Sequence, residues 1–442
     1  MALTNTGRRF TRTGALALIT VALVAAAGGA TADVLVLRCG NIVDVEKLQL
    51  RGATQIVIEG DRIRSLDALD TPVPDGATVI DLSEHTCMPG LMDMHVHLIA
   101  EYSERSNLER FTLNPTDHAV RAVVNAEKTL LAGFTSVRDL GANGPDIIAV
   151  RNAVNLGLIP GPRIHAAEKS LATTGGHADS SNGMRRDLSG DPGPEEGVVN
   201  GADDARKAVR QRYKNGADLI KITATGGVLS VAKGGQNPQF TTDELEAIVE
   251  TARDYGMHVA AHAHGAEGMK RAVRAGVHSI EHGTLMDDET IKLMKKHGTW
   301  YVPTILAGTW VAEKAKIPGF FPDAVRPKAA SIGPKIQQTF ARAHRAGVKI
   351  AFGTDTGVSA HGDNAQEFSL MVEAGMPPLE TIRSATLRTA QLLGVEDQLG
   401  SLTAGRLADI VAVPGDPSAD IELMQHVDLV IKAGEVVKRP GD

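Results

Sequence analysis

Short apolar runs typical of β-strands occur near both ends of the chain. Runs at 34–37, 55–59 and 77–81 are rich in Val, Ile and Leu, and turns containing Gly or Asp-Gly separate them. Runs at 409–413 and 427–431 have a similar apolar composition and are followed by a Gly-containing turn. We therefore predict that the two ends pair into one small β-domain, with the termini close in space.

The middle of the chain alternates between stretches of helical periodicity and short apolar runs. The predicted helices lie near 116–132, 203–215, 242–256, 265–275, 287–297 and 335–346. The predicted strands lie around His95 and at 135–138, 163–167, 219–222, 259–262, 279–282, 301–304 and 350–353.

This alternation favours an α/β fold, a (β/α)₈ TIM barrel. A doubly wound sheet is the alternative, but no GxGxxG motif opens a helix after the first strand. We predict a β-sandwich domain formed by residues 33–88 and 396–442, with the barrel in residues 89–395. With 442 residues, 43% of them hydrophobic, the chain is long enough for both.

Residues 1–32 are typical of a signal peptide. Arginines at 8, 9 and 12 precede an apolar run over 15–27, and Ala30-Thr31-Ala32 has the small-x-small cleavage pattern. The run is shorter than a membrane span of about 20 residues, which favours cleavage over an uncleaved anchor. We expect a periplasmic or secreted protein without stable membrane insertion.

Charge and cysteine content narrow the possible partners. The formal net charge is -7 and no basic block runs through the chain, which argues against a nucleic-acid partner.

Cys39 and Cys87 are the two cysteines. Two cysteines do not make a disulfide framework, so we expect small buried thiols, although export would permit their oxidation.

Several polar residues fall at the carboxyl ends of predicted strands, the face on which barrels build active sites. His95 and His97 form an HxH pair on one side of a strand, so both can reach one metal ion. His262 and His282 end two later strands, and neutral imidazoles suit Zn²⁺ and related ions. Asp355 ends the last strand, where a carboxylate can bind metal and exchange a proton with bound water.

Lys221 lies between two isoleucines on a predicted strand, where a charged ammonium group is unfavourable. One interpretation is that it extends to solvent or pairs with Asp218. The other is that CO₂ carboxylates it, because desolvation supplies the neutral amine that this reaction requires. The resulting carbamate offers two oxygens, which can bridge two cations.

In this order, HxH, Lys, His, His and Asp on successive strands resemble the amidohydrolase superfamily, in its binuclear branch with a carboxylated lysine. Segment 89–97 (PGLMDMHVH) is similar to that superfamily's PGxID and HxH motifs, with Met92 replacing the usual aliphatic residue. Segments 221–227, 262–265 and 280–283 resemble the subgroup of Xaa-Pro dipeptidases, C-terminal-residue carboxypeptidases and ochratoxin-hydrolysing amidohydrolases. The resemblance covers nearly the whole mature chain.

The resemblance implies two divalent ions, Zn²⁺ by preference, that share a bridging hydroxide. The implied ligands are His95, His97, the Lys221 carbamate and Asp355 for one ion, and the same carbamate, His262 and His282 for the other. The hydroxide would attack the amide bond to a C-terminal amino acid, and Asp355 would carry the proton to the leaving amine. The implied substrates are dipeptides, N-acyl amino acids and ochratoxin A-like aryl amides of phenylalanine. A homo-oligomer is expected.

Further residues at the same rim are candidates for substrate contact. His177 lies on a Gly-rich loop after the third strand, which permits close approach of a substrate. His264 follows a ligand by two residues and is a candidate to polarise the scissile carbonyl or to contact a substrate carboxylate. For both, a structural role beside the ligands is the alternative. Lys233 is a possible anion contact, with an exposed lysine as the alternative.

Two other functions stay open on the sequence. The same ligands could hydrolyse a cyclic amide or an imidazolone ring. Outside enzymes, a degenerate barrel could serve as an exported metal-binding protein. A binding module, however, has no need of Asp355 beside a bound water, which favours an enzyme. Nucleotide and serine-hydrolase chemistry are not supported, because GxxxxGK[ST] and GxSxG motifs are absent.

Overall fold

The computed structural model describes residues 34–232 and 234–441. The predicted signal peptide at 1–32 and Lys233 lie outside these described residues. Residues Asp33–Asp442 form one compact unit. Among the described residues, no helix combines the length and apolarity that a membrane crossing requires.

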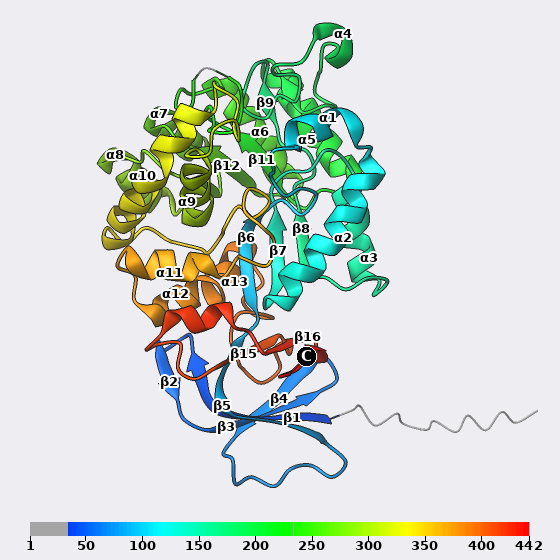
Figure 1. Ribbon diagram of the computed structural model, residues 1–442, viewed down its shortest axis with the longest axis vertical. Coiled ribbons are helices and arrows are strands. Elements are labelled where there is room, and N and C mark those ends of the chain that lie inside the picture. The colour runs from blue at the N-terminus through cyan, green and yellow to red at the C-terminus, as the bar shows by residue number, and fades with distance from the viewer. Residues whose placement is uncertain (1–33, 233, 442) are drawn as a thin grey trace, which may run out of the picture. The chain divides into compact units, whose positions relative to one another are not determined.

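Strands from both ends of the described chain form one eight-stranded sheet (Figure 1). Its members are β1 (Val34–Asp44), β2 (Gln49–Arg51), β3 (Thr54–Glu59), β4 (Arg62–Asp67), β5 (Thr78–Pro89), β15 (Ile410–Pro414), β16 (Leu429–Lys432) and β17 (Glu435–Lys438). The strand order is β17-β16-β15-β5-β1-β3-β4, and β2 pairs with β1. The antiparallel pairing of β15 with β5, with Ile410 opposite Pro89, joins the two chain ends as predicted. Alternate apolar side chains from both ends share one core cluster, which includes Leu37, Ile56 and Ile431.

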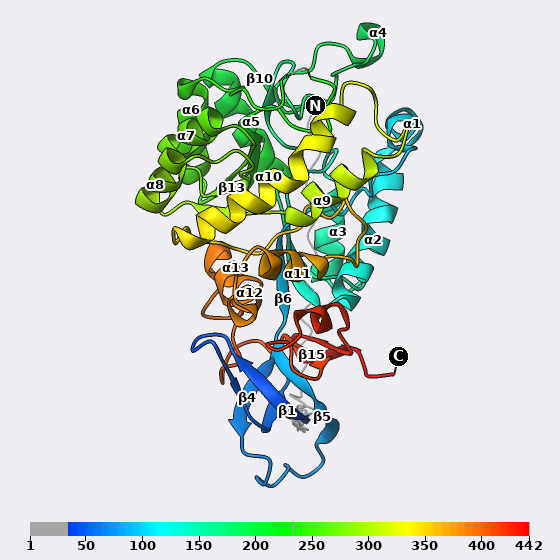
Figure 2. The same ribbon diagram turned by 60° about the vertical axis from the view of Figure 1, so that its left-hand side comes forward.

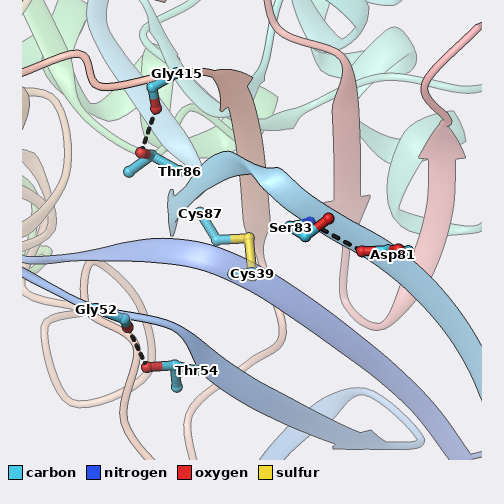
Figure 3. The surroundings of a disulfide bond; sticks show 8 residues. All are labelled: Cys39, Gly52, Thr54, Asp81, Ser83, Thr86, Cys87 and Gly415. Carbon is cyan, nitrogen blue, oxygen red and sulfur yellow. Dashed lines mark hydrogen bonds between the residues drawn. A yellow bond between two sulfur atoms is a disulfide. The ribbon is translucent and has the colours of Figure 1, made fainter. Parts of the chain in front are cut away.

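A disulfide bond links Cys39 of β1 to Cys87 of β5, and both residues are fully buried (Figure 3). The expectation of two separate thiols is therefore wrong. The two strands run parallel, and Ile42 rather than Cys39 lies opposite Cys87 in the register. Because the two strands are far apart in the sequence, their pairing could not be predicted from the local pattern of apolar residues.

The barrel strands form two parallel sheets. One contains β6 (Leu91–Val96), β7 (Phe134–Asp139) and β8 (Arg163–Ala166); the other contains β11 (Ile220–Thr223), β12 (Val259–Ala263), β13 (Ser279–His282) and β14 (Trp300–Val302). The helices around them are α2 (Pro115–Leu131), α3 (Asp146–Asn155), α5 (Ala202–Asn215), α6 (Thr242–Asp254), α7 (Ala266–Ala275), α8 (Asp288–His297), α9 (Ile305–Lys314) and α10 (Arg326–Arg345). Figure 2 shows α6, α7 and α8 on one side of the strands and α2 and α3 on the other.

Backbone hydrogen bonds join these two sheets on both sides. At one junction the amide of Asp218 donates to Ala166, and Leu171 forms a parallel bridge with Ile222. At the other, residues 350–352 bond to β14 and, through the amide of Met94, to β6. The arrangement is that of the predicted (β/α)₈ barrel. Residues 350–353, predicted as the eighth strand, contain one isolated bridge, between Ile350 and Tyr301, rather than a regular strand.

Other elements were not predicted from the periodicity. They are α1 (Ser106–Thr112), β9 (Ala172–Thr173), α4 (Arg186–Ser189), β10 (Val198–Val199), α11 (Gln366–Glu373), α12 (Pro378–Ser384), α13 (Leu387–Leu393) and the 3₁₀ helix η1 (Ile421–Gln425), together with α3 and α9. Helix α9 lacks a clear polar face, since its first four residues are all buried. Helix α10 begins at Arg326 rather than near 335. The short helices α1 and α4 have no buried residue.

Candidate metal centre

The structure brings His95, His97 and Asp355 together at the carboxyl ends of the barrel strands. We call these three residues the first ligand group. One potential ligand atom from each lies within 4.8 Å of the other two. Asp355 Oδ1 is 3.5 Å from His95 Nε2 and 3.3 Å from His97 Nε2. This convergence of two imidazoles and a carboxylate matches the ligand set that a divalent metal ion needs.

A buried charged network holds His95. Its Nδ1 atom lies 3.0 Å from Glu281 Oε2, and Glu281 Oε1 accepts a hydrogen bond of 2.8 Å from Arg138. The Arg138 guanidinium also donates to the carbonyl of Met94 and to the hydroxyl of Ser279. Arg138 is only 1% exposed and Glu281 is 0% exposed. The network therefore crosses the barrel interior and joins β6, β7 and β13.

These partners fix the tautomers of the two histidines. Because His95 Nδ1 donates to a carboxylate, its Nε2 atom carries the lone pair. His97 Nδ1 donates to the carbonyl of Gly141 at 2.8 Å and is oriented in the same way. Burial lowers the pKa of His95 well below its usual range. Burial opposes protonation of His97 too, but the hydrogen bond and charge of Asp355 raise its pKa.

Asp93 ties the HxH strand to the turn that carries Asp355. Its carboxylate accepts hydrogen bonds from the amide of His95, from the amide and hydroxyl of Thr354, and from the side chain of Asn364. Burial raises the pKa of Asp93 to about 6 despite these bonds. The two segments that supply the first ligand group are thus held to one carboxylate.

His262 and His282, which we call the second ligand group, lie beside the first, and Lys221 lies next to His95. Lys221 Nζ is 3.3 Å from His95 Nε2. The His282 ring centroid is 4.6 Å from that of His262 and 5.0 Å from that of His95. Burial lowers the pKa of Lys221 to about 8. All six predicted ligands therefore surround one small space, and the lysine in it has an amine that loses its proton readily.

The pairing of Lys221 with Asp218, one of the interpretations above, is not found. Asp218 accepts a hydrogen bond of 2.7 Å from Arg151 and another from the amide of Ala166. Successive residues of a strand point to opposite sides, and Asp218 precedes β11 by two residues on a half-exposed edge. Extension of Lys221 to solvent is excluded as well, because it is 4% exposed.

Neutral partners hold the second ligand group. His282 Nδ1 lies 2.7 Å from the hydroxyl of Thr304, and His262 Nε2 lies 3.3 Å from the carbonyl of Gly226. His282, Thr304 and Asp355 all have positive φ angles of 53–69°. This left-handed conformation is uncommon for residues other than glycine and is most unfavourable for a β-branched side chain. The strand ends at this site are thus strained where they turn toward the cavity.

His177 and His264 lie against the second group. The His177 ring stacks on His262 at 4.4 Å, and its buried Nδ1 atom has no hydrogen-bond partner. His264 Nδ1 lies 2.7 Å from the hydroxyl of Thr284. Burial lowers the pKa of His177 to about 3 and that of His264 to about 4, so both rings are neutral near pH 7. Each can offer one ring nitrogen to a substrate.

A cavity of about 260 Å³ opens onto these residues. All eight predicted site residues line it, together with Ser170 and Thr223. Its opposite wall is apolar and consists of Val228, Leu229, Ala307, Gly308, Val311, Ile332, Ile336 and Val358. A molecule in this cavity would contact the ligand groups on one side and hydrophobic side chains on the other.

The residues that hold the candidate ligands in place were not predicted from the sequence. Arg138 and Glu281 are charged residues inside apolar strands, as Lys221 is, and that signal could have singled them out. Asp93 belongs to the quoted motif but was given no role. Thr304 and Thr284 carry no signal, because threonine is ordinary at strand ends.

Comparison with known proteins places this arrangement among described hydrolases. Residues 86–437 match the amidohydrolase family. Ochratoxinase of Aspergillus niger is 31% identical over 433 residues, which cover 93% of this chain and 88% of that protein. A solved Xaa-Pro dipeptidase with methionine bound in the active site is 53% identical, with a TM-score of 0.89 over 91% of this chain and 99% of that one. A prolidase complexed with N-methylphosphonate-L-proline is 34% identical, with a TM-score of 0.83 over 92% and 100%.

Proposed function

The chain belongs to the amidohydrolase family, and on this premise we propose that it hydrolyses the amide bond to a C-terminal amino acid. Membership makes it a hydrolytic enzyme that acts on C–N bonds. The proposed substrates are dipeptides, N-acyl amino acids and ochratoxin-like aryl amides of phenylalanine. The observation that carries the proposal is the convergence of both ligand groups on one apolar-walled cavity, in a chain similar to a dipeptidase that binds methionine.

We propose that the cavity holds two divalent ions, Zn²⁺ by preference. The first group would hold one ion, and His262 and His282 would hold the other, with Lys221 carboxylated and shared by both. The four candidate histidines suit metal binding because each has one ring nitrogen bonded to a protein partner, and the other ring nitrogen remains for a metal ion. The lowered pKa of Lys221 favours the neutral amine that carboxylation needs. When bound, the ions polarise the amide carbonyl and activate water.

The chain's own residues move the proton and hold the substrate. Asp355 is the proposed proton carrier: its Oδ1 accepts a proton from the attacking water and returns it to the leaving nitrogen. Burial would raise the pKa of Asp355, but His95 and His97 outweigh it and lower the pKa, so the carboxylate is ionised before the reaction. His264 and His177 are the proposed contacts for the substrate carbonyl and carboxylate, because each has an available ring nitrogen in the cavity.

Turnover of a defined substrate panel tests the proposal. The panel contains Xaa-Pro and other dipeptides, N-acyl amino acids, an aryl amide of phenylalanine, and cyclic imides and imidazolones. We expect hydrolysis of the linear amides with a free C-terminal carboxylate, loss of activity after chelation, and recovery with Zn²⁺. Activity confined to the cyclic compounds would overturn the proposal in favour of a cyclic amidase.

The role of His264 can be tested separately with one substrate pair. His264→Ala should lower kcat/KM about 10- to 150-fold for the acid, because a hydrogen bond to a charged group is lost. The same substrate with an amidated carboxylate should lose much less. Equal losses on both would mean that His264 serves the reacting centre instead, and no loss on either would remove it from the site.

A further inference from the structure

Lys328 on α10 holds the segment that covers one side of the cavity. Its Nζ atom donates to three backbone carbonyls, those of Gly227 at 3.1 Å, Ser230 at 2.6 Å and Ala232 at 3.0 Å. An ammonium group has three N–H donors. All three are therefore engaged within Gly227–Ala232, which we call the tethered segment, and none remains to bind a substrate anion.

The tethered segment begins directly at the candidate metal centre. The carbonyl of Gly226, the preceding residue, accepts from His262. Gly227 packs so closely on His177 that an added Cβ atom would lie 2.2 Å from the ring. The next two residues, Val228 and Leu229, form part of the apolar cavity wall. Lys328 therefore acts on a backbone whose side chains face the space where a substrate would lie.

Leu229 lines three cavities. Besides the cavity at the metal centre, it lines an outer cavity of about 630 Å³ and a third of about 260 Å³. Tyr102 lines both of these outer cavities and packs with Leu229 in one apolar cluster. Pockets for small molecules usually measure about 300–1,000 Å³, so the inner cavity alone is small for a complete substrate.

The aromatic composition of this region is also unusual. Aromatic residues make up only 3% of the chain. Even so, Tyr102, Trp310, Phe320 and Phe321 pack together with ring centroids 4.9–6.5 Å apart, in the same cluster as Val228 and Leu229. Of these four residues, Tyr102 lines the outer cavities, so an apolar or aromatic group that extends beyond Leu229 would meet an aromatic ring held in place by the cluster.

We propose that Lys328 is a positioning residue for an acyl-group subsite, in which Leu229 and Tyr102 receive a bulky apolar or aromatic acyl group. The inference rests on the proposed function, with the substrate carboxylate on the histidines of the inner cavity and the acyl end pointing outward. The tether keeps the tethered segment against α10, so that Leu229 bounds the passage between the inner and outer cavities. Substrates with a short acyl group do not reach this wall.

Two amides of methionine that differ only in the acyl group test the proposal. Wild-type enzyme should prefer N-hydrocinnamoyl-L-methionine over N-acetyl-L-methionine by about tenfold or more in kcat/KM, since burial of a phenyl group is worth at least that much. Lys328→Met removes the three donors but keeps the apolar stem. It should raise KM for the hydrocinnamoyl substrate several-fold and erase most of the preference, with metal content and kcat on the acetyl substrate near wild type.

Control variants separate the tether from charge and from folding. Lys335→Met removes the charge of an exposed lysine on the same helix and should leave the preference unchanged. Lys328→Arg keeps donors and charge and should retain part of the preference. Leu229→Ala should reproduce the loss of preference without touching the tether, which keeps the test valid even if Lys328→Met fails to fold.

Three outcomes would overturn the proposal. One is a wild-type enzyme that hydrolyses both substrates without preference, which leaves the proposed function intact. Another is an equal loss on both substrates, or a loss of metal, in Lys328→Met, because the tether would then serve the metal centre. The third is a preference unaffected by Leu229→Ala. Failure of the proposed function itself would show differently, as no turnover of either amide by metal-loaded wild-type enzyme.

Discussion

The two ligand groups differ in what holds them. In the first, His95 bonds to the Glu281 carboxylate, which is paired with a buried arginine. In the second, His282 meets the hydroxyl of Thr304 and His262 meets a backbone carbonyl. Hydrogen bonds to charged groups contribute about 1.5–3 kcal/mol, against about 0.5–1.5 kcal/mol for neutral pairs. His95 is thus fixed by charges shared among three strands, whereas His97, which bonds to the carbonyl of Gly141, and the second group depend on weaker and more local partners.

Under the proposed function, the two groups would form two metal positions of different rigidity on one barrel face. A site whose ligands are anchored by buried charge keeps its geometry with or without a ligand. A site held by hydroxyls and a loop carbonyl can adjust when a substrate arrives. Lys221 lies between them, within 3.3 Å of a first-group histidine, and would belong to both. A substitution that affects both groups should therefore have a larger effect than one that affects the second group alone.

Lys221→Ala should have the largest effect, because it removes the residue shared by both groups. We expect loss of bound metal and of nearly all turnover, with partial recovery when short carboxylates are added. Metal analysis and activity assays on the purified variant check this. Lys169→Ala, at a half-buried lysine outside the cavity, is the control and should keep its metal. Full metal content in Lys221→Ala would remove the lysine from the centre.

Asp355→Asn should retain the fold and much of the metal but lower kcat by about 10²–10⁴-fold, the usual contribution of general acid–base catalysis. The amide cannot carry the proton, although it preserves the shape of the side chain. Steady-state kinetics beside metal analysis separate the two roles. A kcat close to that of wild type would contradict proton transfer through this residue.

Glu281→Gln should lower the affinity for the first-group ion about 10–100-fold, the usual effect of removing a partner of a metal-bound histidine. It also leaves Arg138 buried without its partner, which costs about 3–5 kcal/mol of stability. Chelator competition measures the affinity, and thermal unfolding reports the stability. Ser279→Ala removes a neutral partner of the same carboxylate and is the matched control, with a much smaller expected change.

Thr304→Val should have the smallest effect. It deletes the hydroxyl beside His282 but keeps the β-branched shape at a residue with φ of 53°. Loss of a neutral hydrogen bond predicts a decrease in affinity for the second ion of about 2- to 13-fold. If chelator competition shows a loss as large as that in Glu281→Gln, the proposed contrast between the two groups fails.

The convergence of the candidate ligands could be predicted from the sequence better than the contacts that hold them. His95, His262 and His282 could be placed because each ends an apolar run, and a barrel brings such ends to one face. Glu281 also lies on a recognisable strand, but its contact with His95 depends on which side chains meet across the barrel interior. Only packing decides that. The stacking of His177 on His262 depends in the same way on a loop whose course has no periodic signal.

In the β-domain, too, contacts between distant segments were harder to predict from the sequence than the strands themselves. Strands β1, β3, β5, β15 and β16 were predicted from apolar runs and turns, whereas the short β2, β4 and β17 were not. The location of the predicted strands at both chain ends indicated that they pair. The disulfide between Cys39 and Cys87 was missed because it depends on the parallel alignment of β1 with β5. Residues 350–353 were predicted as a strand from composition, yet the chain there makes one isolated bridge, at Ile350, before it turns at Asp355.

The pairing of β5 with β15 has a consequence for how the protein is made. Strand β5 leads directly into β6, which carries His95, but its partner β15 follows the whole barrel in the sequence. Contacts between such distant residues form slowly, and an unpaired strand edge invites association with other chains. The edge of β5 that pairs with β15 therefore stays open until the barrel segments between the two strands have been synthesised. During that interval the open edge exposes the nascent chain to aggregation.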